Sequence, residues 1–277
     1  MTAADGGTGP KAAPRVLFVY YSYTGQTAKV LDGAAEAFRQ RGCEVHTAAI
    51  EFVDAKYAEP FTRFPMRKVW PDMFSVLPAQ NRGQTGEIRT PDAVRDGNYD
   101  LVCLGSPTWW DTVSMPLRSF LTSGEAAPLL DGTPYAVFVV CRRKWRRNLE
   151  AVRELADKNG GRFADSIHFG YPGGELPSLL SLASYLGSGE YRDRYLGLKL
   201  PPTNISDAQV GQARAFAGKL ADRLFGKRDA TSVRRPHRLA RQRRDDPFGV
   251  RQRGVLARAD RRVRRRRDHI GHLDRRR

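Results

Sequence analysis

The chain has 277 residues and a mass of 31.1 kDa, and 40% of its residues are hydrophobic, which suits one sizeable folded domain. Its longest apolar runs are much shorter than the roughly 20 residues that a membrane-spanning helix requires, so no membrane span is expected. The formal net charge of +17 is unevenly distributed, because residues 228–277 contain 19 Arg and 6 Asp. That segment carries a net +13 and the rest of the chain +4, so the two parts need separate explanations.

The cysteines and the N-terminus bear on the cellular compartment. Cys43, Cys103 and Cys141 cannot all pair, and each lies in an apolar, strand-like stretch. Free thiols of this kind are typical of a reducing compartment. Residues 1–14 contain Gly, Ala and Pro but no apolar core of a secretory signal. We expect a disordered segment over residues 1–14 and a cytoplasmic protein.

Strand-like and helix-like segments alternate along the chain. Residues 15–20 form a continuous apolar run that predicts a strand buried on both faces. Further strands are expected at residues 43–50, 100–105, 134–141 and 162–169. Apolar residues at helical spacing predict helices over about 30–42, over 115–121, from Trp145 onward and over 206–225. Ser206 and Gln209 form a capping box at the start of the last helix. This alternation predicts a doubly wound α/β domain over residues 15–226.

Two segments are too long to be simple crossovers between strands. Residues 51–98 contain Phe61, Phe64, Trp70 and Phe74, and residues 170–205 carry a patch rich in leucine. Long excursions in α/β proteins often form lids or substrate walls. Extra helices that only cover an edge of the sheet are an equally good interpretation.

Hydroxyl side chains and one glycine connect the first predicted strand to the first helix. The connection reads Ser22-Tyr23-Thr24-Gly25-Gln26-Thr27 and lies at the carboxyl edge of the sheet, where doubly wound folds bind ligands. It lacks the lysine of a P-loop and the three glycines of a dinucleotide-binding fingerprint. Free N–H groups at a helix N-terminus and neighbouring hydroxyls still favour a phosphate. The structural alternative is a hydroxyl-rich helix cap.

A tryptophan pair follows the third predicted strand. The sequence there is Gly105-Ser106-Pro107-Thr108-Trp109-Trp110-Asp111. Aromatic faces at this edge suit a flat polycyclic ligand, and Thr108 and backbone groups can hydrogen-bond the edge of a heterocycle. Asp111 is a further candidate partner of such a ligand or of a water molecule. The alternative is that the tryptophans pack inward beneath a neighbouring helix.

Together these two connections, followed by Met115-Pro116-Leu117-Arg118-Ser119-Phe120-Leu121, resemble the flavodoxin family, and its oxidoreductases more closely than its short acidic electron carriers. The resemblance covers about residues 15–169 by motif and extends to about 226 by element order. It implies a flavodoxin-like α/β fold: a doubly wound, parallel five-stranded sheet of order 2-1-3-4-5 with helices on both faces, here with two long insertions. It also implies bound FMN, with its phosphate at Ser22–Thr27 and its isoalloxazine against Ser106–Asp111.

The connection after the fourth predicted strand departs from the pattern of the family. It reads Cys141-Arg142-Arg143-Lys144-Trp145-Arg146-Arg147-Asn148, whereas many members carry small residues and glycine there. Five cations beside the expected flavin would neutralise an anionic reduced flavin, or bind the 2′-phosphate of NADPH or an acidic substrate. A solvated basic turn is the alternative, but cations oppose the dipole at a helix N-terminus. We therefore add Cys141, Arg142 and Arg143 to the expected cofactor site.

These features predict an enzyme, an FMN-dependent oxidoreductase in which the flavin carries the chemistry and no catalytic side chain is required. The resemblance implies NAD(P)H as donor and a small, quinone-like organic acceptor. His46 and His168 have no further ligand at metal spacing, so no metal is expected. The alternatives are an electron carrier that docks on redox protein partners and an FMN-free interaction module. A homodimer is left open.

The Arg-rich segment over residues 227–277 is expected to be disordered, because it has few large apolar residues and its residues 228–277 carry a net charge of +13. One interpretation is an arm that binds nucleic acid by neutralising phosphates, a partner that nothing in the body suggests. Beyond Lys227, however, the chain lacks Lys, Glu, Asn, Tyr, Met, Trp and Cys. We favour the second interpretation, that this segment is a GC-rich gene read out of frame.

Overall fold

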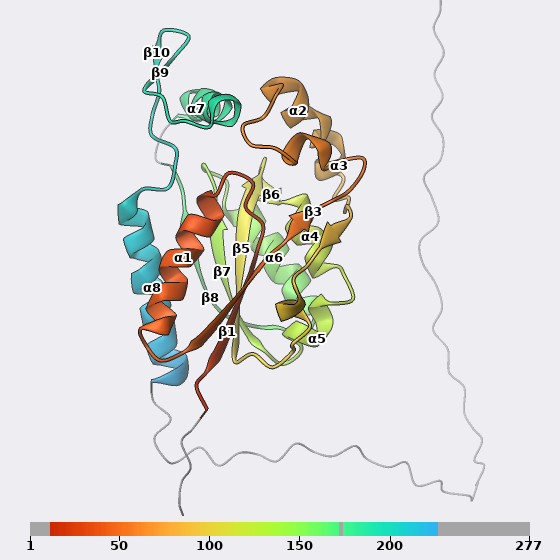
Figure 1. Ribbon diagram of the computed structural model, residues 1–277, viewed down its shortest axis with the longest axis vertical. Helices are drawn as coiled ribbons and strands as arrows, with labels where there is room; N and C mark the ends of the chain where they lie inside the picture. Colours follow the sequence, from red (N-terminus) through yellow and green to blue (C-terminus); the bar gives the residue numbers. More distant parts are fainter. Residues whose placement is uncertain (1–11, 172–173, 227–277) are drawn as a thin grey trace, which may run out of the picture. The chain divides into compact units, whose positions relative to one another are not determined.

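The computed structural model of the chain describes residues 12–171 and 174–226 (Figure 1). Its central sheet contains five parallel strands in the order β2-β1-β5-β7-β8. The strands are β1 (Arg15–Tyr20), β2 (Glu44–Ala49), β5 (Leu101–Trp109), β7 (Pro134–Val140) and β8 (Arg162–Phe169). Counted along the chain, these five strands have the order 2-1-3-4-5, which confirms the predicted flavodoxin-like doubly wound sheet. The predictions for residues 1–11 and 227–277 lie outside the described residues.

The continuous apolar character of β1 reflects burial on both faces of the sheet. In β1, Val16 and Phe18 belong to one core and Leu17 and Val19 to the other, and all four side chains are fully buried. Successive side chains of a strand point to opposite faces, so a strand between two helical layers needs apolar residues at every position. This pattern is why the sequence predicts β1 with its observed bounds.

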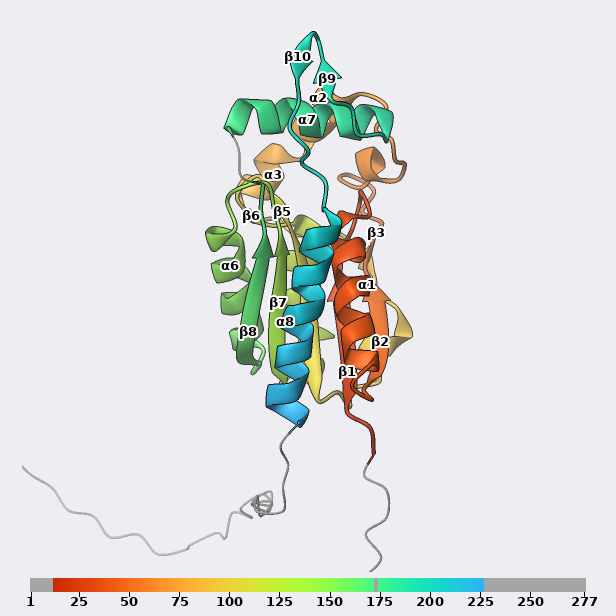
Figure 2. The same ribbon diagram turned by 90° about the vertical axis from the view of Figure 1, so that its left-hand side faces the viewer.

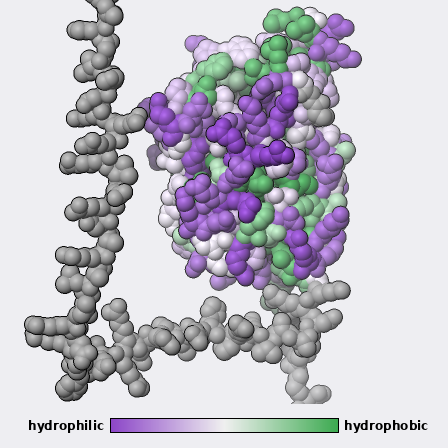
Figure 3. Space-filling model, turned by 180° about the vertical axis from the view of Figure 1, so that it is seen from behind, coloured by the Kyte–Doolittle hydropathy of each residue, from purple (hydrophilic) through white to green (hydrophobic). Residues whose placement is uncertain are grey.

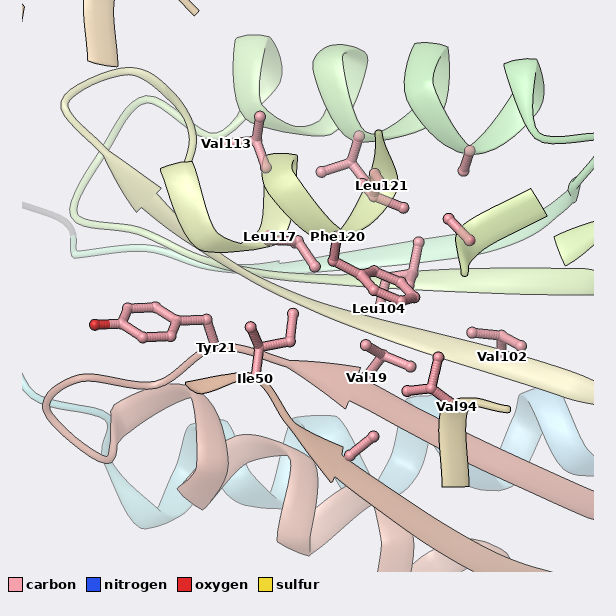
Figure 4. Packing of buried hydrophobic residues seen from close by; sticks show 14 of the residues in the cluster. Val19, Tyr21, Ile50, Val94, Val102, Leu104, Val113, Leu117, Phe120 and Leu121 are labelled. Carbon is pink, nitrogen blue, oxygen red and sulfur yellow. The ribbon is translucent and has the colours of Figure 1, made fainter. Parts of the chain in front are cut away.

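Helices cover both faces of the sheet. On one face α1 (Gln26–Arg39) lies beside α8 (Asp207–Phe225), as Figure 2 shows, and α8 begins with the predicted capping box. The other face is covered by α4 (Met115–Leu121), α5 (Ala126–Leu130) and α6 (Arg146–Lys158). Figure 4 shows the core on this second face, where Phe120 of α4 packs near Val19 and Leu104 of the sheet.

The first long insertion contains several short elements. These are β3 (Glu51–Phe52), which pairs antiparallel with β4 (Ile88–Arg89), the helices α2 (Val69–Ser75) and α3 (Leu77–Asn81), and two 3-10 turns, Glu59–Phe61 and Asp92–Val94. The second insertion contains α7 (Glu175–Ser188) and a hairpin of β9 (Arg194–Tyr195) and β10 (Leu198–Lys199).

Both insertions reach the same end of the sheet. Figures 1 and 2 place α2, α7 and the hairpin at the carboxyl ends of the parallel strands, and α7 runs across the strand direction. The insertions therefore cover the edge at which the sequence predicts a ligand. Within the described ranges, no helix is both long and apolar enough to cross a membrane.

The third predicted strand extends further than expected. The sequence predicts that the strand ends at Gly105, but β5 continues to Trp109 and folds back through a tight turn into β6 (Thr112–Val113). Thr108 pairs with Val113 and Trp109 with Thr112. Thr108 and Trp109 are residue types that favour strands, and the antiparallel return pairs their backbone groups, so the prediction that this strand ends at Gly105 is wrong. Trp110 occupies the turn with a positive φ of 60°.

Candidate functional site

The connection between β1 and α1 presents unpaired backbone N–H groups at the carboxyl edge of the sheet. Gly25 precedes α1 with a φ of 75°, a conformation that side-chain-bearing residues rarely adopt. The Ser22 hydroxyl accepts a hydrogen bond of 3.2 Å from the N–H of Ala28. No hydrogen bond within the described residues occupies the N–H groups of residues 24–27, and the first turn of α1 has no acidic residue. This geometry suits an anion.

Two side chains of this connection hold the insertions instead of facing a ligand. The Tyr23 hydroxyl donates a 2.6 Å hydrogen bond to the carbonyl of Arg63, and its ring meets Phe61 and Phe64 edge-on. Burial raises the pKa of Tyr23 to about 12, so this hydroxyl keeps its proton. Gln26 donates to the hydroxyl of Tyr185 on α7. We infer that these two residues serve a ligand through their backbone.

Thr27 lies deeper than its neighbours in this connection. Its side chain is buried, and a Cβ built at Gly105 would lie 3.1 Å from its methyl group. The same Cβ would lie 2.4 Å from Leu31 and 2.7 Å from Tyr20. Glycine at position 105 therefore lets α1 pack closely on β5, directly behind the predicted site.

A buried hydrogen-bond network fixes the end of β5. Ser106 donates from its hydroxyl to Oδ1 of Asn148 at 2.6 Å, and Nδ2 of Asn148 donates to the hydroxyl of Thr108 at 2.7 Å. Asn148 is fully buried at the start of α6. Sequence reasoning did not select Asn148, although it is a neutral amide that follows a run of cations at the start of a helix. This network joins the second and third connections.

The two tryptophans have different surroundings. Trp109 stacks on Phe61 of the first insertion, with ring centroids 4.6 Å apart and an angle of 25°, and meets Tyr21 edge-on at 5.8 Å. It therefore has a packing role against the insertion. Trp110 lies at the turn between β5 and β6, and Asp111 pairs with Arg147. The role of both rings toward a ligand stays a prediction.

Arg142 lies beneath α7 at the end of β7. Its guanidinium donates to the Ser178 hydroxyl at 3.3 Å, and its carbonyl accepts the N–H of Tyr171 at 2.7 Å. Burial lowers the pKa of Arg142, which Glu175 opposes, and arginine remains charged. Burial also raises the pKa of the Cys141 thiol to about 12, so Cys141 is a protonated, weakly reactive side chain. A partly buried cation with one long hydrogen bond favours an anionic ligand.

The other cations of this connection are tied to nearby groups. Lys144 pairs with Glu175 at 3.7 Å, and Arg147 with Asp111. Trp145 stacks on His168, with centroids 4.1 Å apart, and the Arg146 guanidinium lies 5.2 Å from the Trp145 ring. Burial and the nearby Arg146 lower the pKa of His168, so its ring is neutral at neutral pH. These contacts position the basic segment at the edge of the sheet.

Helix α7 contacts two of the three predicted ligand-binding connections. Ser178, near its start, contacts Arg142 of the third connection, and Tyr185, near its end, contacts Gln26 of the first. The carbonyl of Leu186 accepts the N–H of Met66 at 2.7 Å, which joins α7 to the first insertion. Helix α7 therefore contacts the first and third connections and the first insertion. In the described residues no cluster of His, Cys, Asp and Glu could hold a metal ion.

The fold and this edge define a flavodoxin-like doubly wound α/β protein. No protein-family model and no curated sequence matches the chain. Its structure is similar to an archaeal flavodoxin (12% identity, TM-score 0.42), with 76% of this chain and 98% of that chain covered. It is also similar to oxidised flavodoxin 1 from Bacillus cereus (13% identity, TM-score 0.43), with 76% of this chain and 98% of that chain covered. A third similar structure is a putative flavoprotein from Bacteroides uniformis (16% identity, TM-score 0.41), with 60% of this chain and 96% of that chain covered. The fold assignment rests on the strand order, because likeness at these scores carries no functional argument.

Proposed function

We propose that the chain binds FMN at the carboxyl edge of its sheet and passes reducing equivalents from NAD(P)H through FMN to a small, quinone-like acceptor. One observation carries this proposal. The unpaired N–H groups before α1 follow β1, the neighbouring strand β5 ends at Trp109, and α7 contacts both Gln26 at the start of α1 and the half-buried Arg142 after β7. In a doubly wound sheet this is the place where ligands bind.

The residues present fit the two ends of FMN. The N–H groups of residues 24–27 and the hydroxyls of Ser22 and Thr24 would hold the phosphate, because they offer donors without a competing acid. Backbone groups of Pro107–Asp111 would border the ring system, and Cys141 and Arg142 would form a third wall. When bound, FMN supplies the ability to accept a hydride and to release electrons.

The chain's own residues would prepare this environment. Arg142 keeps a positive charge in a partly buried position and would stabilise negative charge on a bound ligand. Arg143 and Lys144 are exposed and would attract the additional phosphate of NADPH.

The same insertions favour an enzyme over an electron carrier. A carrier must present its flavin to a partner protein, whereas α7 and the first insertion lie over the sheet edge here. A covered site instead suits small reactants that enter and leave.

An anaerobic titration tests this proposal. The purified full chain is loaded with FMN and titrated with NADPH and, separately, NADH while the flavin absorbance is followed, and then menadione is added. We expect reduction by at least one nicotinamide and reoxidation by the quinone. Reduction by dithionite but by neither nicotinamide would contradict the enzyme and support the carrier.

A further inference from the structure

Exposed apolar side chains gather in the two insertions. Every large hydrophobic side chain that the described part of the chain leaves exposed lies there, and we call this set the apolar tip: Trp70, Phe74, Leu176, Tyr191, Leu196 and Leu198. Leu196 is 82% exposed and Leu176 is 66% exposed. The rest of the described surface has no side chain of this kind, so the apolar tip is a localised feature rather than general surface character.

Helix α7 exposes part of its apolar side and buries a row of serines. Ser178, Ser181 and Ser184 are buried, with at most 5% of each residue exposed, whereas Leu176 faces the solvent. The helix contains one charged residue, Glu175, in 14 positions. The start of α7 therefore presents Leu176 to the solvent, whereas Leu179 and Leu182 are partly buried against the cluster of Met66, Met73 and Leu186.

The arrangement of these elements suits a planar surface. Figures 1 and 2 show that the β9–β10 hairpin projects beyond α7, and that α7 runs across the strands. Figure 3 shows hydrophobic side chains at this end, with hydrophilic ones beside them. A helix in this orientation would lie in the plane of a membrane interface, and a projecting hairpin would insert its leucines first.

Aromatic and basic residues beside the leucines fit the headgroup region of a bilayer. Trp70 and Tyr191 belong to the residue types that favour this region. Arg192, Arg194 and Lys199 flank the exposed leucines of the hairpin segment, where Glu190 and Asp193 are the only acids. Lipid phosphates attract such cations, although three cations against two acids make charge a supplement to apolar burial.

An open cavity next to the hairpin offers a place for one headgroup. The cavity has a volume of about 400 Å³ and lies between α2, α7 and β9. Arg192, Glu190 and Ser184 contribute to its lining, and the buried Ser184 hydroxyl has no hydrogen-bond partner within the described residues. A buried hydroxyl without a partner favours a polar ligand.

We propose that the apolar tip docks this protein on the surface of a phospholipid bilayer, with the hairpin leucines inserted and without a membrane span. The proposal does not depend on a bound cofactor, so it stands or fails separately from the proposed function.

Vesicle flotation tests the proposal with the full chain. The vesicles contain phosphatidylcholine with phosphatidylglycerol, and the salt concentration is 1 M, at which the Debye length is ~3 Å and the attraction of the Arg-rich segment is screened. We expect the wild-type chain to float. The double variant Leu196→Ser/Leu198→Ser should bind at least tenfold more weakly and keep its thermal midpoint, because both side chains are exposed.

At low salt, a second comparison uses two variants that each remove one positive charge. Arg192→Gln should weaken flotation several-fold more than Lys219→Gln, which removes an exposed charge on α8. Absence of wild-type flotation at 1 M salt, or equal flotation of the leucine variant, overturns the proposal. If the chain instead forms a dimer that the leucine variant loses and does not float, the apolar tip is an interface between two copies and the proposal is wrong.

Discussion

Gln26 and Tyr185 form a hydrogen bond of 3.3 Å between the first residue of α1 and helix α7, in which the Gln26 amide donates to the tyrosine hydroxyl. The same side chain accepts the N–H of Ile205 at 2.7 Å. One residue of the predicted phosphate connection thus holds the second insertion at two places. The second insertion is therefore hydrogen-bonded to the connection between β1 and α1, where the phosphate is predicted to bind.

Replacement of Gln26 should loosen the second insertion. Gln26→Ala removes both hydrogen bonds, each of which contributes about 0.5–1.5 kcal/mol, so amides in residues 174–205 should exchange with solvent several-fold faster. Hydrogen exchange followed by mass spectrometry measures this. Gln40→Ala, which loses only a surface contact to Glu36, is the control. Equal exchange in both variants would show that Gln26 does not hold the insertion.

Gly105 should tolerate no larger side chain. Gly105→Ala places a Cβ 2.4 Å from Leu31 and 2.7 Å from Tyr20, and we expect a loss of about 1–3 kcal/mol in the free energy of unfolding from overpacking. Gly124→Ala is the matched control, because its Cβ would meet nothing within 4 Å. Urea denaturation measures the free energy of unfolding of both variants. Equal values would contradict the close approach of α1 to β5.

The buried amide of Asn148 should be important for stability. Asn148→Ala leaves the hydroxyls of Ser106 and Thr108 without their partner, which should cost about 1–3 kcal/mol of unfolding free energy. Glu150→Ala changes an exposed residue of the same helix and should cost less than about 0.5 kcal/mol. A thermal midpoint of Asn148→Ala that matches the Glu150→Ala control would be evidence against the network.

The exposed cations after β7 should distinguish the two nicotinamides. The variant Arg143→Gln/Lys144→Gln should raise KM for NADPH several-fold and change that for NADH less, and added salt should reduce the difference. Arg214→Gln/Lys219→Gln removes the same charge from α8 and serves as the control. Steady-state kinetics provide the measurement. KM values for both nicotinamides that stay unchanged in the variant and insensitive to salt would contradict a ligand-binding role for Arg143 and Lys144.

The alternation of apolar strands and amphipathic helices made the doubly wound class predictable, because strands such as Val16–Val19 are apolar at every position and indicate burial on both faces. The order of the strands came from the resemblance to the flavodoxin family. The capping box of Ser206 and Gln209 placed the start of α8 by local chemistry alone. The position of Gly25 before α1 follows in the same way.

The packing of the insertions and the buried network at the site depend on contacts between residues that are far apart in the sequence. The stacking of Trp109 on Phe61 joins β5 to an insertion about 50 residues earlier, and no periodic pattern indicates it. Asn148 contacts Ser106 across 42 positions. The extension of β5 through Trp109 also depends on its pairing with Thr112, which local propensity did not reveal.

Titration of the FMN-free chain with FMN tests the central claim most directly. We predict saturable binding of one FMN per chain, and about 0.5–1.5 kcal/mol weaker binding in Thr24→Val, which loses one hydroxyl donor, whereas Thr47→Val on β2 should bind as the wild type does. Thr24 is changed alone because Thr27 is buried near Gly105. Failure of the folded wild-type chain to bind FMN would contradict the account.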